Sequence, residues 1–389
     1  MSGSLAMFAG AGAAQSVSPG VADADAAARN AASVLILAGG TGGHIFPGIA
    51  VAQALRERGV PVLWLGSDGG LETQLVPKAG IELRTLPVRG VRGKGLLVRL
   101  AAPFRVAAAV HRAWRLIGRE RPRSALALGG FAAGPAGVAA WLRRVPLLVH
   151  EQNRVPGVTN RILARFARRR LCGFHGALAG GEWVGNPVRA VIAALPEPAV
   201  RYAARSGPLH LLVLGGSQGA YGLNVVLPQV LQQIVPTRPL LIRHQSGAKQ
   251  FAQTQQAYLA AGVNATVDAF IDDMAGAYAW ADIVVCRAGA LTLAELCAAG
   301  LPAVLVPFPA AVDDHQTRNA GALVEAGGAR LVAEGDGFAL RLAAALSDLC
   351  SGDADAARAR LLAMAQGART LAKPDAADRI ADLCLQVAA

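Results

Sequence analysis

Short apolar runs alternate with alanine-rich helix-like stretches along most of this 389-residue chain. The run SVLILAGG at 33–40 is followed by a helix-like stretch at 48–59 and by a second apolar run, VPVLWLGS, at 60–67. The same order recurs as ALALGG at 125–130, a helix-like stretch at 136–144 and VPLLVHEQN at 145–153. Strands joined by crossover helices form parallel sheets. The pattern therefore predicts an α/β fold with doubly wound parallel sheets.

Prolines interrupt this alternation at 184–208, and it begins again with LHLLVLGGSQGAYGLN at 209–224. A chain of this length suits two domains. We expect one Rossmann-like domain at 33–190 and a second at 191–371. Residues 1–32 are rich in Ala, Gly and Ser and have no basic stretch ahead of an apolar one. We therefore expect a disordered extension there rather than a secretory signal.

The stretch GGTGGH at 39–44 joins the first predicted strand to the first predicted helix. Such a loop offers backbone N–H groups to a phosphate. It does not follow the dinucleotide pattern GxGxxG, because Ile45 stands where the third glycine should be. It does not follow the Walker pattern either, because no lysine follows it. We expect a phosphate-bearing ligand whose class these two motifs do not identify.

A second glycine loop, GGSQG at 215–219, begins the second half of the chain. It can serve as a phosphate cradle that includes Ser217 and Gln218. It also matches GxSxG, the nucleophile turn of α/β-hydrolases, for which Asp282 or Asp313 with His315 would complete a triad. A plain structural turn is the third interpretation, and the sequence leaves all three open.

The formal net charge of +12 favours a polyanionic partner. Residues 88–115 interleave basic side chains with Leu, Val, Phe and Trp. That mixture suits the surface of an anionic membrane. An ordinary surface helix with an apolar core face explains it equally well. Nucleic acid is disfavoured, because the segment has few aromatic residues for stacking.

Three further features restrict the class of protein. The run at 124–142 is uncharged but broken by glycine and proline, so we expect a strand, a loop and a helix rather than a membrane span. The five cysteines lack CxxC pairing and should be buried, reduced thiols. The histidines are scattered and the two DxD patterns lie in unsuitable stretches, so we expect no metal site.

Residues 270–309 contain a third predicted strand-to-helix junction, RAGALTLAELCAAG, with a carboxylate at Glu295 on the first turns of the helix. A lone carboxylate there can be an ordinary solvent or capping residue. It can also bind both hydroxyls of a ribose while the helix N-terminus faces a diphosphate.

This junction, together with GGTGGHIFPG, GGFAAGPAG, HEQNRVPGVTN, VGNPVR, GGSQGA, HQSG and DDHQTRNA, closely resembles the MurG family. These bacterial transferases add N-acetylglucosamine to undecaprenyl-pyrophosphoryl-muramoyl-pentapeptide. The resemblance runs from about residue 33 to the C-terminus, with the motifs in the family's order. It implies a GT-B fold, two Rossmann-like domains facing across a cleft, in which a C-terminal helix at about 372–389 packs back on the first domain.

The resemblance also implies the ligands and their residues. The donor is UDP-GlcNAc, and its residues would be Arg189, Ser217, Gln218, Ile271, Arg287, Ala290, Leu291, Thr292, Glu295 and Gln316, with His315 less secure. The acceptor lipid would meet Thr41, Gly42, Gly43, His44, Gly130 and Asn153. No metal or cofactor is implied. The family's basic, apolar region matches residues 88–115, which favours a peripheral protein at the cytoplasmic face of the cell membrane.

The implied chemistry is an inverting displacement at the anomeric carbon by the 4-hydroxyl of the muramoyl sugar. His44 is our candidate base, because an ordinary pKa of about 6.5 leaves it largely neutral near pH 7. A plain hydrogen bond to the acceptor is the alternative role. Glu151 is a second candidate catalytic residue. Another GT-B nucleotide-sugar enzyme, a glycolipid synthase or an epimerase, is the alternative function.

Overall fold

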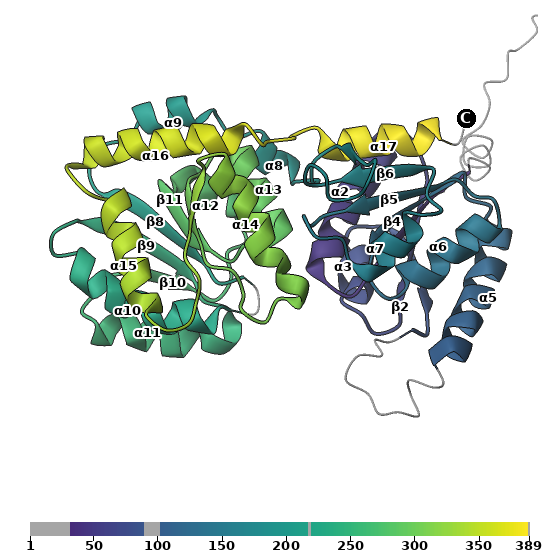
Figure 1. Cartoon of the computed structure of the whole chain (residues 1–389), viewed down its shortest axis with the longest axis horizontal. Helices are drawn as coiled ribbons and strands as arrows, with labels where there is room; N and C mark the ends of the chain where they lie inside the picture. Colours follow the sequence, from purple (N-terminus) through teal and green to yellow (C-terminus); the bar gives the residue numbers. More distant parts are fainter. Residues whose placement is uncertain (1–31, 89–101, 217–218, 388–389) are drawn as a thin grey trace, which may run out of the picture.

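The chain folds into two lobes, each built around one parallel sheet (Figure 1). The computed structural model describes residues 32–88, 102–216 and 219–387. Residues 1–31 of the predicted extension and residues 89–101 of the basic segment at 88–115 therefore lie outside the described residues, as do Ser217 and Gln218.

The strands of the first lobe are β1 (Val34–Ala38), β2 (Val62–Ser67), β3 (Glu82–Leu86), β4 (Ser124–Gly129), β5 (Leu147–Glu151), β6 (Arg169–Cys172) and β7 (Glu182–Trp183). Its helices are α2 (Gly42–Glu57), α3 (Glu72–Lys78), α5 (Ala102–Glu120), α6 (Ala133–Leu142) and α7 (Val158–Leu163). The strand order is β3-β2-β1-β4-β5-β6-β7, and every pairing is parallel.

The second lobe has the strands β8 (Leu209–Leu214), β9 (Leu240–Gln245), β10 (Thr266–Asp268), β11 (Ile283–Cys286), β12 (Ala303–Leu305) and β13 (Ala329–Leu331). The helices from here to the C-terminus are α8 (Ala190–Ala193), α9 (Pro198–Ala203), α10 (Tyr221–Ile234), α11 (Phe251–Ala260), α12 (Met274–Trp280), α13 (Ala290–Ala299), α14 (His315–Glu325), α15 (Phe338–Leu349), α16 (Ala354–Arg369) and α17 (Ala376–Gln386). The sheet order is β10-β9-β8-β11-β12-β13, again all parallel.

Both sheets reverse their strand order at one point, which fixes where ligands can bind. In the first sheet this point lies between β1 and β4, and in the second it lies between β8 and β11. Ligands of doubly wound sheets bind outside the carboxyl ends of the strands at such a point. The glycine loops at 39–41 and 215–219 follow β1 and β8 directly. The predicted α/β class with two doubly wound sheets is thus confirmed.

Strand β1 shows how the sequence pattern makes the first core. All five of its residues are buried, as expected for a central strand covered on both faces. Val34, Ile36 and Ala38 pack with the core on one face, while Leu35 and Leu37 pack with the core on the other. Complete burial of a Val, Ile or Leu side chain contributes about 1.5–3 kcal/mol.

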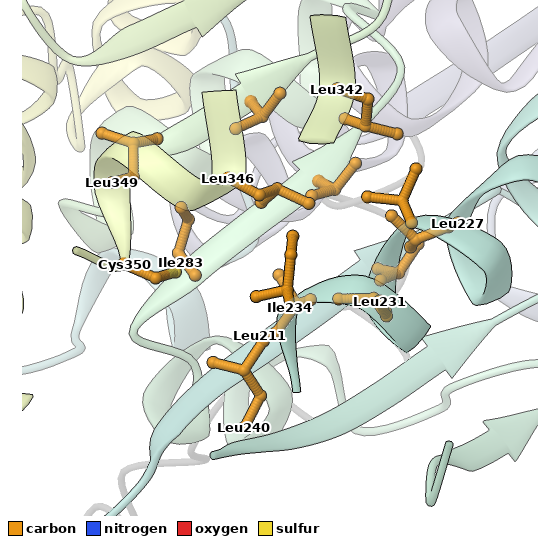
Figure 2. Close-up of a cluster of buried hydrophobic side chains, with 14 of the residues drawn as sticks. Leu211, Leu227, Leu231, Ile234, Leu240, Ile283, Leu342, Leu346, Leu349 and Cys350 are labelled. Carbon is orange, nitrogen blue, oxygen red and sulfur yellow. The ribbon is translucent and has the colours of Figure 1, made fainter. Parts of the chain in front are cut away.

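The second core lies between β8, β9 and β11 and the helices α10 and α15 (Figure 2). Leu227, Leu231 and Ile234 form the buried face of α10 at helical spacing. Leu342, Leu346 and Leu349 do the same for α15. These faces hold the sheet that carries the second glycine loop.

Helix α17 packs against the first lobe, although α16 before it covers the second (Figure 1). Ile380 and Cys384 are buried in the first core, and Ser124 Oγ donates a hydrogen bond of 2.8 Å to the carbonyl of Cys384. Arg58, at the C-terminal cap of α2, makes ion pairs with Asp378 and Asp382 of α17. The chain therefore crosses between the lobes near its C-terminal end.

The uncharged run at 124–142 forms β4, a short loop and α6, as predicted. In the described part of the chain, no helix is both long and apolar enough to span a bilayer. The five cysteines are buried and unpaired, as predicted.

Candidate functional site

The loop after β1 places a helix N-terminus at the end of the first sheet. Gly40 has φ +88°, and Thr41 is extended before α2 begins. His44 and Ile45 donate the first backbone hydrogen bonds of the turn, both to the carbonyl of Thr41. The amides of Gly42 and Gly43 come before these donors and have no partner among the described residues. Such free amides at a helix N-terminus bind anions.

His44 lies on the first turn of α2 with its ring turned back toward the loop. Its Nδ1 lies 3.2 Å from the carbonyl oxygen of Gly39 and 3.3 Å from Oγ1 of Thr41. A carbonyl can only accept, so Nδ1 carries the proton and Nε2 of the neutral ring keeps its lone pair. Burial lowers the pKa of His44, although Glu151, the Gly39 carbonyl and Glu72 act in the opposite direction. The imidazole is therefore neutral near pH 7, and its Nε2 has no hydrogen-bond partner in the described part of the chain.

Two glycines at the end of β4 make space for this ring and for the loop that precedes it. Gly129 has φ +121° and Gly130 has φ +93°, a region that favours glycine. A Cβ on Gly129 would lie 2.8 Å from Nε2 of His44, and one on Gly130 would lie 2.2 Å from the carbonyl oxygen of Gly39. The structure thus brings the predicted residue Gly130 next to the first glycine loop.

Glu72 holds the first glycine loop through a hydrogen bond to its backbone, a role that no sequence motif indicates. The side chain is fully buried, and its carboxylate accepts hydrogen bonds from the amide of Gly40 at 2.9 Å and from the amide and hydroxyl of Ser67 at 2.8 and 2.6 Å. Burial acts to raise the pKa of Glu72, but the hydrogen bonds from Ser67 and Gly40 outweigh it and lower this pKa. Glycines at 39, 66 and 70 leave room for the carboxylate.

Glu151 ends β5 and is almost completely buried. One carboxylate oxygen accepts from the amide and the side chain of Asn153 at 2.9 and 3.3 Å. The other accepts from the amide of Gly157 at 3.1 Å and from Asn160 Nδ2 at 3.0 Å. Both oxygens are therefore engaged in holding the loop at 153–157. This geometry favours a positioning role for Glu151 over proton transfer.

The second lobe carries its own helix N-terminus, that of α13. Gly289 is extended, and its carbonyl accepts the first helical hydrogen bond, from Leu293 at 3.0 Å. The amides of Ala290, Leu291 and Thr292 have no partner among the described residues. Helix α13 contacts α2 of the first lobe, so the two helices that carry these sites meet.

Glu295 lies on α13 and pairs with Arg189. Its Oε1 lies 2.9 Å from Nε and 2.8 Å from Nη2 of Arg189, and its Oε2 accepts from the hydroxyl of Tyr278 at 3.1 Å. Burial raises the pKa of Glu295, while Arg189 acts to lower it. Burial and the charge of Glu295 raise the pKa of Tyr278 well above its ordinary value, so this hydroxyl remains a donor. No motif in the sequence points to Tyr278.

Three other predicted donor residues are held by their neighbours. The amide of Ile271 donates to Gln245 Oε1 at 3.2 Å, and its carbonyl accepts no hydrogen bond from the described residues. Arg287 donates to the carbonyls of residues 306 and 307 and pairs with Glu334 at 2.8 Å. Gln316 accepts from the amide of Phe308 at 2.9 Å through Oε1, so its NH₂ group can donate elsewhere.

Two alternatives from the sequence can be compared with the structure. Asp282 is fully buried directly before β11, pairs with Arg205 and accepts from the amide of His210 near the start of β8. It therefore lies at the amino ends of the strands, whereas the GGSQG loop follows the carboxyl end of β8. Its assignment to a hydrolase triad is therefore wrong. Asp353 of the second DxD pattern caps α16. Within the described residues, no cluster of three or more His, Cys, Asp or Glu side chains could hold a metal ion.

Comparison with known proteins places this site in a family. The glycosyltransferase family 28 N-terminal domain matches residues 34–171, and the C-terminal domain of the same family matches residues 210–380. A protein of Xanthomonas campestris pv. campestris is 59% identical over 93% of this chain and 83% of its own length. One of Xylella fastidiosa is 58% identical over 91% of this chain and 95% of its own. Both are named UDP-N-acetylglucosamine--N-acetylmuramyl-(pentapeptide) pyrophosphoryl-undecaprenol N-acetylglucosamine transferase.

A solved structure agrees with these relatives. The crystal structure of Acinetobacter baumannii MurG superposes with a TM-score of 0.81 at 38% identity, covering 91% of this chain and 99% of that one. The similarity extends over both lobes and both glycine loops. The chain belongs to glycosyltransferase family 28 and, within it, to the MurG family of N-acetylglucosamine transferases.

Proposed function

We propose that this chain transfers N-acetylglucosamine from UDP-GlcNAc to the 4-hydroxyl of the muramoyl sugar of undecaprenyl-pyrophosphoryl-MurNAc-pentapeptide, with inversion. The observation that carries this proposal is the 59% identity over 93% of the chain to relatives named for that transfer. The lobes supply the two helix N-termini that a diphosphate donor and a diphosphate acceptor require.

In the reaction, the acceptor oxygen bonds to the anomeric carbon, and the bond from that carbon to the UDP oxygen breaks. The hydroxyl proton passes to Nε2 of His44, whose Nδ1 proton is held toward the carbonyl of Gly39. General-base assistance of this kind typically contributes about 10²–10⁴-fold. The lowered pKa of His44 supports this role, because it keeps the ring neutral.

On the donor side, the free amides of Ala290, Leu291 and Thr292 and the guanidinium of Arg189 would stabilise the departing diphosphate. Glu295 would bind the ribose hydroxyls, with one oxygen exchanging Arg189 for the sugar. The carbonyl of Ile271 can accept from the uracil N3–H. Gln316 would donate to the sugar, and Ser217 and Gln218 stay proposed contacts.

On the acceptor side, the amides of Gly42 and Gly43 would bind the lipid pyrophosphate, with Thr41, Gly130 and Asn153 around it. The position of Gly42, Gly43 and Gly130 supports this assignment, because they follow β1 and β4, between which the first sheet reverses its strand order.

We place the chain at the cytoplasmic face of the membrane as a peripheral protein, and helix α5 supports contact with a membrane surface. It buries Ala109, Ala113 and Ile117 and exposes Phe104 and Trp114. Its arginines at 105, 112 and 115 can contact anionic headgroups, at about 1 kcal/mol for each cation near the surface. Arg143 stacks on Trp114 at 3.4 Å and adds a cation to the same area.

The test is UDP release by the purified chain with UDP-GlcNAc and a soluble analogue of the muramoyl-pyrophosphoryl lipid, in the presence of EDTA. The proposal expects acceptor-dependent UDP release with a disaccharide product and no loss of rate in EDTA. UDP release without acceptor, or conversion of the donor to another sugar nucleotide, would favour a different GT-B nucleotide-sugar enzyme.

A further inference from the structure

Asn319 on α14 is a fully buried amide that joins the two lobes. Its Oδ1 accepts from the amide of Arg154 at 2.8 Å. Its Nδ2 lies 3.1 Å from Oδ1 of Asn153 and 3.4 Å from the carbonyl oxygen of Ala288. Asn153 and Arg154 belong to the loop after β5 in the first lobe, whereas Ala288 follows β11 in the second.

The contacts on either side extend this link to both substrate sites. Toward the first lobe, the backbone N–H and the side-chain NH₂ group of Asn153 both donate hydrogen bonds to Glu151. Toward the second lobe, Ala288 comes directly before Gly289, whose carbonyl begins α13. Gln316 lies one turn before Asn319 on the same helix. One side chain thus connects the proposed acceptor loop with the N-terminus proposed to hold the donor diphosphate.

The chemistry of the amide determines which residue can make this link. Its oxygen faces an N–H donor and its NH₂ group faces two oxygens, so both ends of the amide are used in one orientation. A carboxylate in the same place would face Asn153 Oδ1 and the carbonyl of Ala288 without a proton to donate. A buried polar group left without its partner costs about 1–3 kcal/mol.

We propose that Asn319 is a positioning residue for transfer, which fixes the loop at 153–157 relative to the N-terminus of α13. It thereby sets the distance between the acceptor hydroxyl and the anomeric carbon. This inference rests on the proposed function. Misplacement of reacting groups by about 1 Å can cost about 10²-fold in rate, so a contact between the lobes can matter without touching substrate.

The chain offers a matched control between the same two elements. Nη1 and Nη2 of Arg154 lie 2.9 and 3.2 Å from the carboxylate oxygens of Glu325, also on α14. The side chain of Glu325 is 65% exposed, and exposed ion pairs contribute at most about 1 kcal/mol. Glu325→Gln weakens a contact between the lobes but leaves the bonds of Asn319 to Asn153 and Ala288 in place.

The experiment compares Asn319→Asp, Asn319→Ser and Glu325→Gln with the wild-type chain in acceptor-dependent UDP release. UDP affinity is measured by calorimetry, and folding by thermal melting. We expect Asn319→Asp to lower kcat about 10–100-fold while UDP affinity stays within about threefold, because α13 itself is intact. Asn319→Ser has a hydroxyl too short to reach Asn153 or Ala288, so kcat should fall in this variant as well, without an added charge. Glu325→Gln should stay within about threefold of wild type.

Two outcomes would overturn the inference. One is a kcat for Asn319→Asp and Asn319→Ser equal to that of Glu325→Gln. The other is a loss of UDP affinity in proportion to kcat, which would make Asn319 a support of the second lobe alone. Should Asn319→Asp fail to melt cooperatively, the same comparison is made with Asn319→Ser. A wild-type chain that releases no UDP with acceptor would instead contradict the proposed function.

Discussion

His44 depends on the residues around it for its proposed role as a base. The Gly39 carbonyl determines which ring nitrogen keeps the proton, and Gly129 leaves the space that the other nitrogen occupies. Glu72 holds the amide of Gly40, one residue along the loop. Each of these contacts can be removed by a single substitution, so the role of each can be tested separately.

Gly129→Ala should displace the imidazole ring of His44 and also strain the backbone at residue 129. The new Cβ would lie 2.8 Å from Nε2 of His44, at a position with φ +121°. We expect at least about a tenfold loss of kcat. Gly59→Ala is the control, because Gly59 has φ +71° with nothing within 4 Å of its added Cβ. It should lower the free energy of unfolding by about 1–2 kcal/mol and leave kcat unchanged. Equal kcat values in the two variants would contradict this role of Gly129.

Glu72→Gln should change both the rate and its pH dependence. An amide cannot accept all three hydrogen bonds, so the loop should loosen and kcat/KM should fall about tenfold. The charge of Glu72 raises the pKa of His44, so its removal should shift the acid limb of the kcat/KM profile to lower pH. Glu57→Gln, on the exposed end of α2, is the control. An acid limb that stays in place would refute the coupling between Glu72 and His44.

Pairs of elements fix the donor site in the second lobe. Helix α12 brings the hydroxyl of Tyr278 to Glu295 on α13, and Arg189 reaches the same carboxylate from the segment before α8. The carboxylate proposed to bind ribose is therefore oriented by two elements other than its own.

Tyr278→Phe should weaken the binding of the nucleotide but leave the binding of the acceptor unchanged. Glu295 would lose its hydrogen bond of 3.1 Å at Oε2, and hydrogen bonds to charged groups contribute about 1.5–3 kcal/mol. We expect the Kd for UDP, measured by calorimetry, to rise about tenfold or more. Tyr258→Phe removes a buried hydroxyl of similar kind that pairs with His244 in the second core. If both variants bind UDP equally well, Tyr278 does not orient Glu295.

The sequence predicted the elements of the site better than its connections. Glycine loops, strand runs and the carboxylate of Glu295 are local patterns, because a strand, a turn and a helix follow one another along the chain. Glu72, Tyr278 and Asn319 were missed because their partners are distant. Asn319 contacts a residue 165 positions away, and Glu72 contacts one 32 positions away. Only the folded sheets bring such residues together, and no periodicity marks them.

At the scale of the whole molecule, buried neutral histidines make stability depend on pH. Burial lowers the pKa of His150 to about 4 and that of His244 to about 3, from 6.5. His150 is held by the carbonyl of Gly185 and by Gln152, between the first sheet and the connection to the second lobe. In the unfolded chain both histidines bind a proton below about pH 6.5.

The free energy of unfolding should therefore be constant with respect to these groups above pH 6.5 and should fall as the pH drops from 6.5 toward 4. His150 alone accounts for about 3 kcal/mol of this loss. Urea unfolding from pH 7.5 to 4.5 measures it, and His111→Gln, at an exposed position on α5, should follow the wild-type curve. A free energy of unfolding that does not change between pH 6.5 and 4.5 would contradict the neutral, buried state.

In the proposed reaction, His44 of the first lobe takes the acceptor's proton while the second lobe holds the donor. The most direct measurement is kcat and UDP affinity for His44→Ala, with the soluble acceptor analogue saturating. If His44 is the base, kcat should fall by about 10²–10⁴-fold, with UDP affinity within about threefold of wild type. A kcat within about threefold of wild type, or a loss confined to UDP affinity, would contradict it.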